Sequence, residues 1–154
     1  MVEVLDKISK LKSVCAQETE LLELKSELAT PLLEDVQYIP MLAEWFCELS
    51  NIGVELREIA TRQKNEYLFI ILLLYSLMTL AGEKLVNGLR NILAEMFGYK
   101  SPSGISNLLA GDMAFQYKCD KELRADVDRI YVEIIRRLQE RKIISQDYIL
   151  CLAF

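Results

Sequence analysis

The residues that could perform chemistry in this chain are limited first by the absence of histidine. Without an imidazole there is no serine–histidine or cysteine–histidine pair, and no histidine ligand for zinc or iron. Two glutamate pairs share a helical face, Glu44 with Glu48 and Glu55 with Glu58. Di-metal bundles use such glutamates together with histidines, so we interpret both pairs as solvated acidic faces. We expect no catalytic residue, no cofactor, no metal and no small-molecule ligand.

The four cysteines are the other side chains with intrinsic reactivity. They are far apart, form no C-x-x-C pair and have apolar neighbours: Cys15, Cys47, Cys119 and Cys151. A metal site or a disulfide framework is the alternative, but we predict four small core residues in a reducing compartment. The N-terminal segment has no apolar signal-peptide core, and we therefore expect a cytoplasmic protein.

Length and composition predict one all-α domain over residues 1–154. Apolar residues make up 52% of the chain and charged residues 27%, which is close to a globular average. Only six glycines and three prolines interrupt it, and this favours long helices over many short strands. The formal charge of −5 gives no overall attraction to nucleic acid or to an anionic membrane.

The most hydrophobic segment, residues 67–81, reads YLFIILLLYSLMTLA. As a helix it would be about 22 Å long, too short for a hydrocarbon layer of roughly 30 Å. We therefore expect no membrane span and predict a central helix that is buried on nearly all sides.

The remaining helices are predicted from apolar periodicity, caps and prolines. Between Val4 and Ala29 the apolar side chains recur at alternating steps of four and three residues, and Glu18 and Lys25 interrupt this coiled-coil-like pattern. Further helices are expected over residues 31–38, 40–64, 82–97, 105–110 and 120–142. The predicted fold is an all-α, single-domain bundle of five to seven helices around the central helix.

One segment, residues 88–111, has a pattern of small and apolar residues around a turn. It reads GLRNILAEMFGYKSPSGISNLLAG. Ala94 lies midway in the first helix, Gly98 follows four residues later at the turn, and the pair Ile105–Ser106 opens the second helix. A small residue allows two helices to approach closely, and a glycine permits a positive φ at the turn. The segment resembles the helix-turn-helix found in many bacterial DNA-binding regulators, although its turn is one residue longer.

The resemblance implies that the second helix would contact bases and that nearby basic residues would contact phosphates. Base contacts would come from Ser103, Ser106 and Asn107. Phosphate contacts would come from Arg90, Lys100, Lys118 and Lys121, and from the basic end of the last helix at Arg136, Arg137, Arg141 and Lys142. The alternative is a structural helical corner, because residues 101–115 contain no arginine or lysine.

Two functions follow from these observations. We predict a non-enzymatic helical protein that binds a protein partner or a second copy of itself through its helical faces. The alternative is a small DNA-associated regulator that uses the segment resembling a helix-turn-helix.

Overall fold

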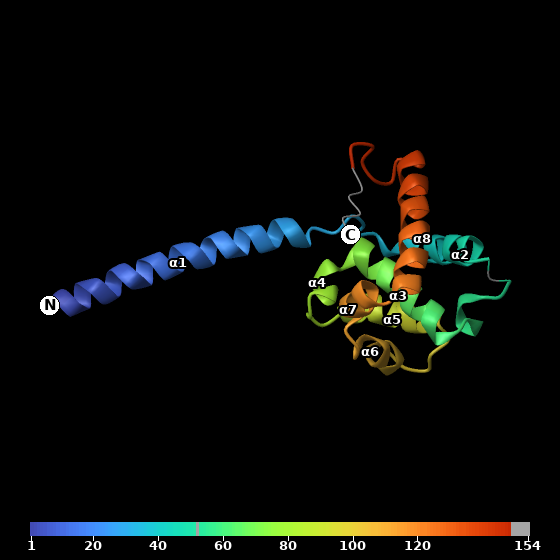
Figure 1. Cartoon of the computed structure of the whole chain (residues 1–154), viewed down its shortest axis with the longest axis horizontal. Coiled ribbons are helices and arrows are strands. Elements are labelled where there is room, and N and C mark those ends of the chain that lie inside the picture. Colours follow the sequence, from blue (N-terminus) through green and yellow to red (C-terminus); the bar gives the residue numbers. More distant parts are fainter. Residues whose placement is uncertain (52, 149–154) are drawn as a thin grey trace. The chain divides into compact units, whose positions relative to one another are not determined.

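The computed structural model describes residues 1–51 and 53–148, and over these residues the chain is helical with no strand. Two units are distinguished, residues 1–30 and residues 31–154. The described part contains eight α-helices, which Figure 1 labels: α1 Val2–Ala29, α2 Ile39–Leu49, α3 Thr61–Tyr75, α4 Leu77–Leu80, α5 Asn87–Met96, α6 Ser103–Leu109, α7 Met113–Cys119 and α8 Lys121–Glu140. Two 3₁₀ turns, Val36–Tyr38 and Leu56–Glu58, precede α2 and α3. The predicted all-α bundle is therefore confirmed.

The first unit is helix α1 alone. Its 28 residues include no buried side chain. A single helix has no core of its own, so the prediction of one domain over residues 1–154 remains a prediction.

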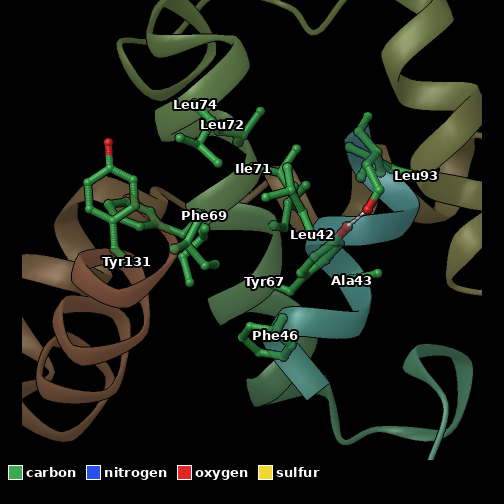
Figure 2. Close-up of a cluster of buried hydrophobic side chains, with 14 of the residues drawn as sticks. Leu42, Ala43, Phe46, Tyr67, Phe69, Ile71, Leu72, Leu74, Leu93 and Tyr131 are labelled. Carbon is green, nitrogen blue, oxygen red and sulfur yellow. Dashed lines mark hydrogen bonds between the residues drawn. The ribbon is translucent and has the colours of Figure 1, made fainter. Parts of the chain in front are cut away.

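The centre of the second unit is α3, as the apolar segment predicted. Its side chains from Glu66 to Leu72, together with Leu74, are buried, and α2 and α8 both contact it. Figure 2 shows the face where Tyr67 meets Phe46. The Tyr67 ring packs edge-on against Phe46 at 5.3 Å and against Phe97 at 5.8 Å, and its hydroxyl donates to the Ile39 carbonyl at 3.3 Å.

The predicted central helix ends earlier than its apolar sequence indicated. At Ser76 the backbone leaves the helical region (φ −156°, ψ 74°), and α4 begins at Leu77. The Ser76 hydroxyl lies 2.7 Å from the Thr79 hydroxyl and Leu74 is the last buried residue of α3. Residues 76–80 are only half-buried, so the polar pair marks where the central helix stops.

The predicted helix over residues 40–64 was wrong in its second half. Helix α2 ends at Leu49, and Asn51 adopts a positive φ of 54° that a continuing helix does not allow. The predicted helix over residues 31–38 is reduced to the short 3₁₀ turn. Helix α7 was not predicted; Asp112 starts it by accepting a hydrogen bond from the Phe115 amide at 3.0 Å.

Helix α8 confirms the sequence prediction at its start. Asp120 accepts hydrogen bonds from the amides of Glu122 and Leu123, each at 3.1 Å, as an N-cap should. Its end differs by two residues, because Arg141 is the C-cap and Lys142 follows with a left-handed φ of 60°. Bonds from Lys142 to Gln139 and from Ile143 to Leu138 close the helix as a Schellman motif.

The prediction that the cysteines are core residues was wrong for two of them. Cys15 and Cys119 are exposed, because one lies on helix α1, which forms a unit by itself, and the other ends the short helix α7. Cys47 is half-buried, and all three are free thiols. Cys151 lies outside the described residues.

Among the residues that the structure describes, no helix is both long and apolar enough to cross a membrane.

Candidate functional site

Helix α1 carries an apolar stripe that repeats every seven residues. We define the apolar stripe by three neighbouring columns on the helix surface: Ile8, Cys15, Leu22 and Ala29; Val4 and Leu11; and Val14, Leu21 and Leu28. A seven-residue repeat drifts by only about 20° per heptad around an α-helix, so each column stays on one side. The stripe runs along the whole of α1.

The opposite side of α1 is polar. The column Asp6, Ser13, Glu20 and Glu27 lies about half a turn from the apolar stripe. Near its start Lys10 pairs with Asp6 at 3.0 Å, one helical turn apart. One polar side and one apolar side identify a helix that packs along one face.

The apolar stripe is exposed to a degree that is unusual for leucine. Leu11, Leu21 and Leu22 are 63%, 64% and 65% exposed. Scattered apolar residues are normal on protein surfaces, but a contiguous row marks an interaction site. We therefore take α1 as the candidate site.

Two charged residues lie in the central column of the apolar stripe. Glu18 and Lys25 continue the column of Val4 and Leu11, so they occupy the centre of the stripe in the second half of α1. They are seven residues apart, about 10.5 Å along the helix, which is too far for them to pair with each other. Neither forms an ion pair within the described part of the chain. A partner that covers the stripe must therefore compensate both charges.

The segment resembling a helix-turn-helix forms a packed corner between α5 and α6. Gly98 has a φ of 72°, and bonds from Gly98 to Glu95 and from Tyr99 to Ala94 close α5 as a Schellman motif. Ala94 and Ile105 are buried, which matches the packing places of the pattern. The Tyr99 ring covers Gly104, where an added Cβ would lie 2.5 Å from it.

Two of the predicted DNA contacts bind each other across this corner. The Arg90 guanidinium donates to the Ser106 hydroxyl at 3.2 Å and to the Asn87 side chain at 2.7 Å. Both Arg90 and Ser106 are half-buried, so they tie α5 to α6. Ser103, Asn107 and Lys100 are exposed, and whether they contact DNA remains a prediction.

A groove of about 1060 Å³ lies beside Arg90 and Ser106, between residues 79–87 and residues 106–113. Its charged lining residues balance, since Lys84 and Arg90 are matched by Glu83 and Asp112. The lining therefore carries no net formal charge.

The basic end of α8 is engaged within the molecule. Arg137 binds the Glu48 carboxylate of α2 at 3.1 and 3.2 Å, and it lies over the Trp45 ring at 5.6 Å. Arg136 pairs with Glu133 and Glu140, and the hydrogen bond from Arg136, together with that from Arg137, lowers the pKa of Glu133 to about 2. The charges of both arginines are therefore compensated by the protein itself.

Four further predicted basic contacts are exposed. Arg141 lies 5.2 Å from the centre of the Trp45 ring and so belongs to the same cluster as Arg137. Lys142 occupies the left-handed position after α8, and Lys118 and Lys121 flank the junction of α7 and α8. The three lysines form no ion pair among the described residues.

A buried carboxyl group, that of Glu66, was not predicted from the sequence. Glu66 is 3% exposed on α3, and its nearest cation is the Arg62 Nε at 3.5 Å. The pKa of Glu66 is raised to about 7, first by burial and then by the charge and hydrogen bond of Asp126, while Arg62 acts in the opposite direction. The position of Glu66 directly before Tyr67, at the border of the apolar segment, was the feature of the sequence that could have indicated its burial.

The described residues contain no group of three or more cysteine or carboxylate side chains arranged to hold a metal ion. The comparisons with known proteins give no relative: no family model, no curated protein and no solved structure matches the chain.

Proposed function

We propose that this protein is a cytoplasmic, non-enzymatic interaction protein that binds a helix of another protein chain through the apolar stripe of α1. The observation that supports this most strongly is that α1, a 28-residue helix that forms a unit by itself, has no core of its own in which to bury the apolar stripe. Burying a single leucine side chain contributes roughly 1.5–3 kcal/mol, and the apolar stripe offers several such side chains in one row.

The seven-residue repeat indicates the kind of partner. Apolar columns at this spacing pack against a second helix, where each side chain inserts between four residues of the neighbour. In proteins most of the stability of a helix comes from packing of its apolar face and not from helix propensity, so a helical partner also stabilises α1 itself. The partner surface we infer is therefore an apolar helix with a compensating charge for Glu18 and for Lys25.

Photo-crosslinking in the intact protein tests this proposal. A photoreactive residue at Leu11 or Leu21 is expected to form a discrete adduct with a protein under native conditions, and mass spectrometry identifies the adduct. The matched controls are Ser13 and Glu20, on the polar side of the same helix. The proposal is wrong if stripe positions and polar positions give the same adducts, or if neither gives any.

A further inference from the structure

We propose, as a refinement that rests on the proposed function, that the partner of α1 is α1 of a second copy, aligned antiparallel about a point between Leu21 and Leu22. The two charges in the central column of the apolar stripe distinguish the possible arrangements of the two helices. Closed symmetric pairs are the commonest protein assemblies, and in them residue i meets residue j while j meets i.

A parallel pair of α1 helices would be penalised by like charges. In a parallel arrangement each residue of the central column faces its own copy, so Glu18 would oppose Glu18 and Lys25 would oppose Lys25. Like charges facing each other across a desolvated interface cost several kcal/mol. In a parallel pair, like charges therefore repel each other at two of the four positions of the central column.

An antiparallel pair turns the same two charges into complementary partners. With the two-fold axis between residues 21 and 22, Glu18 of each helix faces Lys25 of the other, because 18 and 25 are equally distant from the axis. The antiparallel pair thus contains two symmetry-related Glu18–Lys25 ion pairs, each flanked by apolar side chains. Charged pairs of this kind determine register and orientation more than they add affinity.

The apolar residues agree with this register. On one side of the central column Leu21 meets Leu21 of the second copy, and Val14 meets Leu28. On the other side Leu22 meets Leu22, and Cys15 meets Ala29. The overlap covers residues 14–29, the part of α1 in which apolar residues of both outer columns flank the charged central column. One register therefore satisfies both the charges and the apolar columns.

A charge exchange tests the pairing in the full-length chain. Glu18→Lys alone places lysines opposite each other, and Lys25→Glu alone places glutamates opposite each other. Each single change is expected to raise the dimer dissociation constant at least about tenfold in sedimentation equilibrium. The double exchange Glu18→Lys with Lys25→Glu restores complementary charges and is expected to return the constant to within about threefold of the original.

The control for charge alone is Glu20→Lys, which makes the same change on the polar side and is expected to leave the dissociation constant unaltered. Glutamate and lysine have similar helix propensities, so all of these variants keep α1 helical. The antiparallel register is overturned if the double exchange is as weak as the single ones. A chain that stays monomeric at all concentrations overturns self-association, whereas stripe-specific adducts with another protein would still support the proposed function.

Disulfide trapping gives the orientation independently. In the antiparallel register the two Cys15 residues lie about 20 Å apart along the axis, beyond the roughly 7 Å between Cα atoms that a disulfide allows. Oxidation is therefore expected to leave Cys15 uncrosslinked, while Leu21→Cys in a Cys15→Ala background crosslinks to its own copy. A disulfide between two Cys15 residues, with none at position 21, would show parallel pairing.

Discussion

Glutamine in place of Glu66 is expected to stabilise the protein at pH 8 by about 3 kcal/mol, the equivalent of the pKa difference between the folded protein and a free glutamate. The Glu66 carboxyl is 3% exposed, and its pKa is raised from 4.5 to about 7 because burial disfavours its charge. The protonated Glu66 carboxyl therefore makes its full contribution to stability below about pH 4.5, and this contribution is lost as the pH rises through about 7. Glutamine resembles the protonated carboxyl and carries no charge to lose.

Urea denaturation between pH 5 and pH 8.5 measures this effect. The wild-type free energy of unfolding should fall with pH relative to that of Glu66→Gln, and the two curves should converge near pH 5. The matched control is Glu122→Gln, because Glu122 also pairs with Arg62, at 3.1 Å, but has a side chain 82% exposed. This control should shift stability by no more than about 0.5 kcal/mol. Parallel curves for the wild type and Glu66→Gln would disprove the assignment.

Removing the ring of Tyr67 is expected to cause the second large effect. Tyr67→Ala should lower the free energy of unfolding by about 3–5 kcal/mol, because the fully buried ring packs against both Phe46 and Phe97. Tyr67→Phe keeps the ring and loses only the bond to the Ile39 carbonyl, so about 0.5–1.5 kcal/mol is expected. The difference between the two variants separates packing from hydrogen bonding.

The control for Tyr67 is Phe115→Ala, an aromatic residue that is 61% exposed on α7. Its loss should change stability by no more than about 0.5 kcal/mol in the same urea titration. Equal effects at positions 67 and 115 would contradict the placement of α3 at the centre of the core.

The sequence predicted well those features that depend on burial or on a single cap. The apolar segment identified α3 as the central helix, and Asp120 identified the start of α8. The segment around Gly98 was correctly predicted to turn with a positive φ, since few other residues adopt that conformation easily.

The sequence predicted poorly those features that depend on contacts between distant segments. The end of α2 at Leu49 and the break between α3 and α4 at Ser76 were not predicted. Apolar side chains continue past both points, and periodicity alone indicates no break. The pairing of Arg90 with Ser106 and of Arg137 with Glu48 depends on how helices pack, which one sequence does not specify. The exposure of Cys15 followed from α1 having no neighbour in its own unit.

The proposed function requires that another chain, and not the protein's own, covers the apolar stripe of α1. Hydrogen exchange of the full-length protein, measured by mass spectrometry at concentrations where it is monomeric, tests this most directly. Amides of residues 2–29 are expected to exchange far faster than those of α3, and to become protected when a second copy or another helical partner is present. Protection of α1 in the monomer equal to that of α3 would contradict the claim, because the stripe would then be buried within its own chain.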